Sequence, residues 1–251
     1  MLRNDVIIAS GNSSFRQQSL DMLPPVSPVV LCGGIRALPG RDQVSAIAKA
    51  PIDGPWQIAR LGLKGDAQAD LKHHGGPEKA IHHYPRDHYG AWRNEIGTHP
   101  LLDVPGAFGE NLSTAGWTER TVHIGDVVRF GSALLQVSQG RQPCWKLNAY
   151  FGRGDIARRS QESGRTGWYY RVLEEGAAEP GDRLTLVARP RPEWPLSRLI
   201  ALLYRDKDRY GELEQMAALE ELATGWRDLA SRRIQTRATE DWSQRLDGPR
   251  P

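Results

Sequence analysis

The side chain best suited to chemistry is Cys144, in the run Ser-Gln-Gly-Arg-Gln-Pro-Cys-Trp-Lys at residues 138–146. The cations Arg141 and Lys146 favour a thiolate there, and the proline before the cysteine stiffens the turn that presents it. Such a thiolate serves as a nucleophile, a redox centre or a ligand for a soft metal. A strand-like run, Ala133 to Val137, ends in a polar loop before the cysteine, and loops at strand ends often carry sites.

A structural role for Cys144 is the alternative, because free cysteine is among the most buried residue types and usually behaves as a small hydrophobe. The other cysteine, Cys32, ends the apolar stretch Val29-Val30-Leu31-Cys32, and we expect it in the core. Two cysteines do not make a disulfide framework.

Five of the seven histidines fall between residues 73 and 88, which suggests a metal site. His83 and His88 have a spacing seen in some zinc sites, but no cysteine pair or His-Glu-x-x-His helix accompanies them. If residues 80–84 form a strand, His82 and His83 point to opposite faces and do not share a metal. We therefore expect most of these histidines to be exposed or hydrogen bonded to the backbone.

Two glycine-rich loops are candidates for ligand binding. In His74-Gly75-Gly76-Pro77 the two glycines let the chain turn sharply and bring its backbone close to a ligand. In the run 62–66, Lys64 lies between Gly62 and Gly65. Such loops offer backbone N–H groups and a lysine to a phosphate, although neither is a Walker or Rossmann fingerprint.

A third glycine-flanked loop, Gly106 to Leu112, carries Glu110 and Asn111. These groups accept and donate hydrogen bonds that suit a heterocycle. A turn in which Asn111 bonds its own backbone explains the pair equally well, and the sequence leaves both interpretations open.

The elements that position these loops are mostly short strands from Val29 to about Ala188, separated by Gly, Pro and Asp turns, as in a β-barrel. The clearest hairpin joins Val127–Phe130 to Ala133–Val137, and a similar strand follows Gly181-Asp182. One helix is predicted from Pro85 to Ile96, since Tyr89, Trp92 and Ile96 share a face before Gly97.

After the proline-rich link at 189–195, apolar residues recur at helical spacing and predict three short helices. We expect a loose N-terminal extension at 1–27, a β-barrel domain at 28–190 and a three-helix domain at 195–240. Arginines at 227, 232, 233 and 237 raise the alternative of a phosphate-contacting helix-turn-helix unit, but no base-reading signature accompanies them.

The composition narrows the function classes. The formal net charge of +3 over 251 residues is spread along the chain, so we expect neither nucleic acid nor an anionic membrane as a partner. No apolar run approaches the roughly 20 residues that span a bilayer. The first 27 residues lack the pattern of a secretion signal, and we expect a soluble, cytoplasmic protein.

Ordered motifs over most of the chain resemble the MOSC domain, named for the C-terminal domain of molybdenum cofactor sulfurases. They are Gly65-Asp66, His74-Gly75-Gly76-Pro77, Tyr84-Pro85, Phe108 to Leu112, Ile124-Gly125-Asp126, Gln139 to Trp145 and Gly167 to Val172. The similarity is greatest to the YiiM-like branch, the bacterial 6-N-hydroxylaminopurine resistance proteins, and runs from about Ala46 to the C-terminus. In that branch a three-helix domain follows the MOSC domain.

The resemblance implies a mainly β fold with α-helices, in which a MOSC β-barrel binds the molybdenum–molybdopterin cofactor. Similar proteins reduce N-hydroxylated bases and related compounds, removing the hydroxyl oxygen as water. It implies Cys144 as molybdenum ligand and catalytic residue. It also implies that His74 orients the substrate or donates a proton. The implied cofactor-binding residues are Lys64, Gly65, Asp66, Gly75, Gly76, Asn111, Arg141 and Gln142.

Two other functions share these motifs: a persulfide carrier, and a protein that binds the cofactor without turnover. No desulfurase domain with a pyridoxal-binding lysine precedes the motifs, which favours the reductase and argues against pyridoxal phosphate. The chain has no Gly-x-Gly-x-x-Gly fingerprint, and its two cysteines cannot hold an iron–sulfur cluster. We therefore expect a separate electron-donating reductase. The oligomeric state is left open, with a homodimer among the possibilities.

Overall fold

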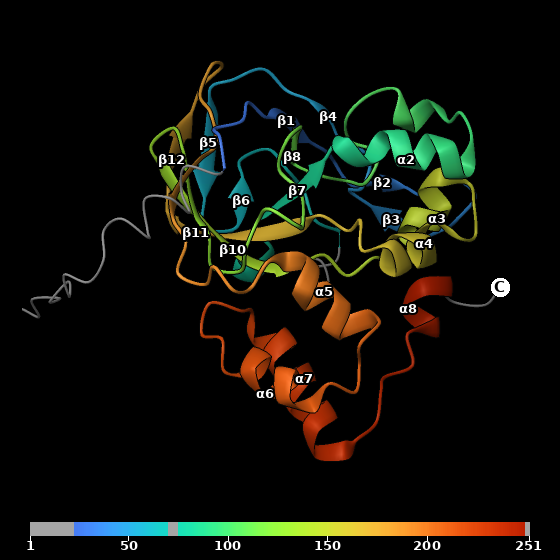
Figure 1. Ribbon diagram of the computed structural model, residues 1–251. Helices are drawn as coiled ribbons and strands as arrows, with labels where there is room; N and C mark the ends of the chain where they lie inside the picture. The colour runs from blue at the N-terminus through green and yellow to red at the C-terminus, as the bar shows by residue number, and fades with distance from the viewer. Residues whose placement is uncertain (1–22, 70–74, 249–251) are drawn as a thin grey trace, which may run out of the picture.

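The computed structural model of the protein describes residues 23–69 and 75–248 (Figure 1). Most of the expected N-terminal extension lies outside these residues. From Leu23 onward the chain packs on the β domain. Leu23 is buried, and Val26 forms an antiparallel bridge with Leu184. The indole of Trp117 donates a 2.8 Å hydrogen bond to the Pro24 carbonyl.

The β domain is built on a mixed eight-stranded sheet in the order β13-β9-β10-β11-β7-β8-β1-β4, which curls into a half-barrel (Figure 1). Only the β7–β8 pairing within it is parallel. These strands are β1 Val29–Cys32, β4 Ala50–Pro51, β7 Ile81–Pro85, β8 Leu112–Thr114, β9 Val127–Phe130, β10 Ala133–Gly140, β11 Trp168–Glu174 and β13 Thr185–Ala188. Two smaller sheets contain β2 Arg36–Ala37, β3 Val44–Ser45, β5 Trp56–Ala59, β6 Gly62–Leu63 and β12 Gly176–Ala178.

The predicted hairpin is confirmed as β9 and β10, with Phe130 opposite Ala133 across the Gly131-Ser132 turn. Gly131 has φ +58°, and an added Cβ would lie 2.2 Å from the Ala177 carbonyl oxygen, so only glycine fits this turn. Strand β10 continues past the predicted end to Gly140. It therefore runs directly into the loop that carries Cys144.

The predicted helix after Pro85 is confirmed as α2, Asp87–Ile96. It buries Tyr89 and Trp92 in a small aromatic cluster around Phe108, and it ends at Gly97, which has φ +80°. The other helices of the β domain are α3 Lys146–Phe151, α4 Ile156–Ser163 and two short 3₁₀ turns at Pro77–Lys79 and Pro100–Leu102.

The C-terminal unit contains the three predicted helices: α5 Leu196–Tyr204, α6 Tyr210–Ala217 and α7 Thr224–Thr236. It shares one hydrophobic core with the sheet, because Ile200 and Trp226 lie against Gly140 of β10. The Ala223 N–H also donates a 2.8 Å hydrogen bond to the Ser138 carbonyl. The chain then continues through α8, Ser243–Asp247, which returns to α3 and α4 (Figure 1).

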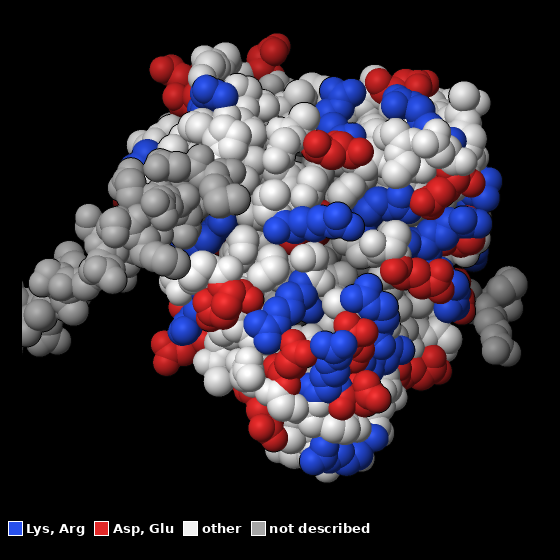
Figure 2. All heavy atoms as spheres, viewed as in Figure 1, with Lys and Arg blue, Asp and Glu red and all other residues white. Residues whose placement is uncertain are grey.

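Basic and acidic side chains are intermixed over the helical unit (Figure 2). Arg233 is buried and donates to the Leu202 and Leu203 carbonyls and to Glu240. The Arg237 guanidinium lies 3.9 Å from the centre of the Tyr210 ring. Two of the four arginines considered for phosphate contact therefore have structural roles. Within residues 23–69 and 75–248, no helix has the length and apolar character needed to cross a bilayer.

His83 lies at the centre of the sheet and gives stability a pH dependence. Burial lowers its pKa from 6.5 to about 3, and its ring nitrogens lie 3.1 Å from the Tyr170 hydroxyl and 2.7 Å from the Thr114 hydroxyl. Between pH 6.5 and about pH 3 the unfolded chain binds a proton at His83 and the folded chain does not, so stability is lost as the pH falls through this range.

We expect His83→Gln to weaken the pH dependence of the unfolding free energy between pH 6 and pH 4. The variant's slope should be smaller by about 1.4 kcal/mol per pH unit, which corresponds to one proton. Urea unfolding at several pH values measures both slopes. Equal slopes for the two proteins would contradict a neutral His83.

Candidate functional site

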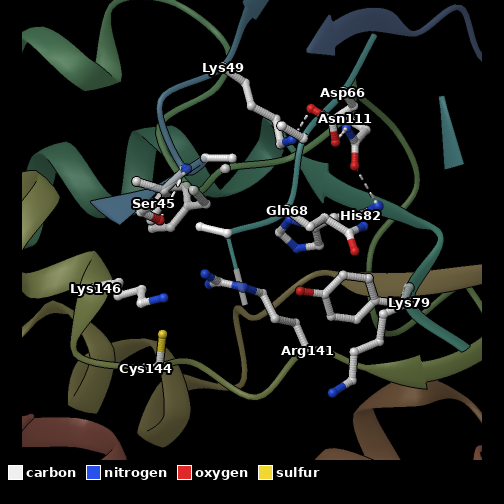
Figure 3. A pocket seen from close by; sticks show the side chains of 17 residues that line it. Ser45, Lys49, Asp66, Gln68, Lys79, His82, Asn111, Arg141, Cys144 and Lys146 are labelled. Carbon is white, nitrogen blue, oxygen red and sulfur yellow. Dashed lines mark hydrogen bonds and ion pairs between the residues drawn. The ribbon is translucent and has the colours of Figure 1, made fainter. Parts of the chain in front are cut away.

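A pocket opens where the end of β10 meets the loops that follow β3 and β6 (Figure 3). The Cys144 sulfur points into this pocket, with the side chains of Lys146 and Arg141 around it. Other lining residues come from segments far apart in the sequence: Ser45, Ala46, Ile47, Lys49, Asp66, Ala67, Gln68, Ala69, Lys79, His82, Phe108, Gly109, Asn111 and Tyr169. The pocket therefore brings Cys144 together with three of the predicted cofactor-binding residues.

Cys144 is both buried and directed at a pocket. It is 6% exposed, and its carbonyl accepts a 2.9 Å hydrogen bond from the Leu147 N–H at the start of α3. The residue follows β10 by four positions, as the loop prediction requires. Burial therefore does not make it a core cysteine, because its sulfur faces a space lined by polar side chains.

Two residues that line this pocket each have a buried side-chain nitrogen without a hydrogen-bond partner among the described residues, Nη1 of Arg141 and Nε2 of His82. The two residues are 7% and 3% exposed. Burial, together with the charge of Arg141, lowers the pKa of His82 well below its ordinary value, so the imidazole is neutral at pH 7. Buried polar groups without partners are rare because desolvation is costly. The Arg141 nitrogen is a donor and so suits a ligand that accepts hydrogen bonds, whereas the neutral imidazole nitrogen donates or accepts according to its tautomer.

Asp66 and Asn111 form the opposite wall and are fully engaged within the protein. Asp66 accepts hydrogen bonds from the Gly33 N–H at 2.9 Å and from the Asn111 amide at 2.8 Å, and it pairs with the Lys49 ammonium. The Asn111 side-chain oxygen accepts from the His82 N–H at 3.1 Å. These two predicted residues thus shape the pocket and position Lys49.

The open question at Glu110 is settled in favour of a structural role. Its buried carboxylate accepts hydrogen bonds from the Gly106 and Phe108 N–H groups at 2.8 and 3.0 Å, and from the Tyr89 hydroxyl at 2.9 Å. Burial raises the pKa of this carboxyl. Glu110 therefore fixes the loop before β8, while its neighbour Asn111 reaches the pocket wall.

The remaining predicted residues lie around the pocket or outside the described chain. Lys64 is exposed, and neither it nor Gly65 lines the pocket. Gly75 and Gly76 precede the 3₁₀ turn that carries Lys79, and Gly76 has φ +94°. Gln142 lines a neighbouring pocket to which Cys144 also contributes. His74 lies outside the described residues, and its role stays a prediction.

The histidine cluster is dispersed by the fold. As expected for a strand, His82 and His83 point to opposite faces of β7, one into the pocket and the other into the core. His88 lies on α2 and pairs with Glu119 at 2.7 Å. Among the residues for which side chains are described, no three His, Cys, Asp or Glu side chains are grouped to hold a metal.

Cys32 is less buried than the sequence predicts. It ends β1, is only partly buried, and packs against the edge of the main core near the Asp66–Lys49 pair. Burial, assisted by Asp66 and opposed by Lys49, raises the pKa of its thiol to about 11. The thiol is therefore protonated at neutral pH and is a poor nucleophile.

Sequence reasoning missed Lys49, Lys79, His82 and Tyr169 as pocket residues. His82 and Tyr169 could have been predicted, because adjacent residues of a strand point to opposite faces and each of these two faces the pocket. The two rings lie 5.0 Å apart on neighbouring strands. Lys49 had no local signal, since its position depends on pairing with Asp66.

The curled sheet, the Cys144 pocket and the helical appendage define a MOSC-domain protein. The MOSC family model matches residues 70–185, and the YiiM-like 3-alpha helix domain matches residues 194–237. The chain belongs to the YiiM-like family. It is 43% identical over 222 residues to Protein YiiM of Escherichia coli, covering 87% of this chain and 97% of that protein. The crystal structure of YiiM from Escherichia coli superposes with a TM-score of 0.75 at 33% identity, covering 90% of this chain and all of that one.

A protein named Reductase from Gibberella moniliformis is 42% identical over 182 residues. The match covers 70% of this chain but 32% of that longer protein.

The Lys49–Asp66 ion pair yields a prediction about the pocket wall. Both side chains are 7% exposed, so Asp66→Asn leaves a buried ammonium without its counter-charge and should destabilise the fold by about 3 kcal/mol. Adding Lys49→Met should recover part of this loss. The control is Arg153→Ala, which breaks a pair with side chains 39% and 36% exposed and should cost less than about 1 kcal/mol. Urea unfolding measures all four proteins, and equal losses for Asp66→Asn and Arg153→Ala would refute the assignment.

Proposed function

We propose that this protein is a cytoplasmic, molybdenum cofactor-dependent reductase of N-hydroxylated compounds, such as N-hydroxylated purine bases. In this proposal Cys144 is the molybdenum ligand. One observation carries it: the Cys144 sulfur faces a pocket lined by Arg141 and His82, each of which has a buried side-chain nitrogen without a hydrogen-bond partner among the described residues. Membership of the MOSC family supports the cofactor, and the relative named Reductase supports the reaction class.

The pocket residues fit a cofactor that is anionic and brings its own metal. Four basic side chains line the pocket, Lys49, Lys79, Arg141 and Lys146, against one carboxylate, Asp66. This excess of positive charge suits a phosphate group. A single cysteine, with no group of three His, Cys, Asp or Glu side chains among the described residues, suits a soft metal whose other ligands belong to the cofactor. In this proposal Arg141 and His82 hydrogen bond the cofactor, and Cys144 binds its metal.

When bound, the cofactor supplies the two-electron chemistry that removes the hydroxyl oxygen. The protein's own residues stabilise charge and donate protons. Arg141 and Lys146 stabilise negative charge beside the sulfur, in a site where burial strengthens electrostatic interactions. Burial raises the pKa of Tyr169, against the effect of Arg141, so its hydroxyl keeps its proton and acts as a donor. His74 remains the proposed proton donor to the departing oxygen.

We expect Cys144→Ala to abolish bound molybdenum and N-hydroxy reduction while the fold stays intact, because a loop thiol contributes a metal bond rather than core packing. Metal analysis per chain, turnover and circular dichroism test this. Cys32→Ala is the matched control and should retain both metal and turnover. A Cys144→Ala protein with normal molybdenum and turnover would disprove the ligand assignment.

The proposed electron donor is a separate reductase, because this chain carries no nicotinamide fingerprint and no cysteine set for an iron–sulfur cluster. Purified protein should reduce an N-hydroxy substrate with reduced viologen. With NADPH alone its turnover should be at background level until a flavoprotein reductase is added. Sustained NADPH-driven turnover by the purified chain, free of contaminating flavoprotein, would contradict this.

A further inference from the structure

A second pocket meets the first at Cys144. The two share Ala69, Lys79, Cys144, Lys146 and Tyr169. The second is also lined by Gln142 and Trp145 from the Cys144 loop and by Gln244 and Arg245 from α8. Cys144 thus lines both spaces, and the C-terminal segment forms a wall of the second one.

Arg245 contacts the Cys144 loop through both its side chain and its backbone. Its guanidinium donates hydrogen bonds to the Pro143 carbonyl and to the Gln161 side-chain oxygen on α4. Its carbonyl accepts a 2.8 Å hydrogen bond from the Trp145 N–H. The residues immediately before and after Cys144 are therefore both held by this one residue.

Neighbouring residues of the segment extend the same attachment. The Asn148 side chain on α3 donates a 2.8 Å hydrogen bond to the Leu246 carbonyl, and Leu246 is buried. At Gly248 an added Cβ would lie 2.8 Å from Cγ of Trp145, so the backbone packs directly on the indole ring. Asp247 pairs with Arg158 of α4 at 3.0 Å.

The surroundings of Arg245 are those of a built-in contact rather than a surface charge. Its guanidinium lies 4.5 Å from the centre of the Trp242 ring and 5.9 Å from that of Tyr204. Burial lowers the pKa of this guanidinium, which nevertheless stays charged at neutral pH. The residue also lies beyond the two family matches, which end at residues 185 and 237. This attachment is therefore a feature of the chain outside both matched domains.

We propose that Arg245 is a positioning residue for Cys144, and that residues 242–248 form a clamp that holds the thiol loop in place beside the two pockets. The clamp deepens the proposed function, on which its catalytic meaning rests, since a fixed thiol keeps the metal at one place relative to the substrate. In the protein without cofactor, the clamp limits access to the Cys144 sulfur. That consequence is measurable whatever reaction the protein catalyses.

The test is alkylation of the cofactor-free full chain by iodoacetamide, with both cysteine peptides followed by mass spectrometry. Arg245→Ala should raise the alkylation rate of Cys144 roughly tenfold by loosening the loop, while the rate of Cys32 stays unchanged. Arg245→Lys should also raise it, because one ammonium does not reproduce the forked contacts to Pro143 and Gln161. Arg205→Ala, which removes an arginine 74% exposed, is the matched control and should change neither rate.

An unchanged Cys144 rate in both Arg245 variants would overturn the clamp. If Arg245→Ala unfolds the protein, both cysteines become reactive together, and Gln161→Met then decides the question. That variant removes one acceptor of the guanidinium and should raise the Cys144 rate by a few fold, with Cys32 again unchanged. No change in the Cys144 rate of Gln161→Met would then also count against the clamp.

A second measurement separates the clamp from the proposed reaction. Loaded Arg245→Lys enzyme should keep its molybdenum content but lose roughly tenfold in kcat. Faster alkylation without any N-hydroxy reduction by wild type would retain the clamp and refute the proposed function. Normal N-hydroxy reduction by wild type and by Arg245→Lys, with an unchanged alkylation rate of Cys144, would support the proposed function and refute the clamp.

Discussion

The pocket depends on the carboxylate of Asp66, which joins three parts of the chain that are far apart in sequence. It accepts from Gly33 after β1 and from Asn111 before β8, and it pairs with Lys49. Asn111 in turn accepts from the backbone of His82 in β7. A short, buried, charge-assisted network of this kind has one good geometry, because each polar atom left without a partner would cost free energy. It therefore sets the distance between the wall that carries Lys49 and the strand that carries His82.

The polar atoms of this wall have hydrogen-bond partners within the protein. On the side of the pocket that carries Cys144, one buried polar atom does not. Arg141 is held at its backbone by the Gly167 carbonyl at 3.0 Å, yet Nη1 of its side chain has no partner among the described residues. Gly167 has φ +69°, and an added Cβ would lie 2.3 Å from the His83 carbonyl oxygen, so the close approach of β11 to β7 requires glycine. Tight packing of β11 on β7 therefore brings Arg141 and the neutral imidazole of His82 to the same pocket.

Local sequence signals predicted the fold well wherever an element is determined by its own residues. The β9–β10 hairpin, helix α2 and the three C-terminal helices follow from alternation, turn residues and helical spacing. Of the predicted site residues, Cys144, Arg141, Asp66 and Asn111 line one pocket, and their roles stay predictions. Lys49 and the clamp residue Arg245 could not be found this way, because each acquires its role from a contact with a distant segment. The partial exposure of Cys32 was missed for the same reason.

The position of Cys144 reconciles two demands that oppose each other. A thiol that binds a metal benefits from burial, which excludes water and strengthens nearby charges, whereas a thiol that takes part in turnover needs open space beside it. A loop after β10 that is fixed only by its own residues would meet neither demand for long, because connecting segments are mobile. Here the loop leaves a central strand, enters α3 directly and is held by α8, and Cys144 lines two neighbouring pockets. The helices around the loop therefore do more than cover the sheet: they hold a nearly buried cysteine beside open space.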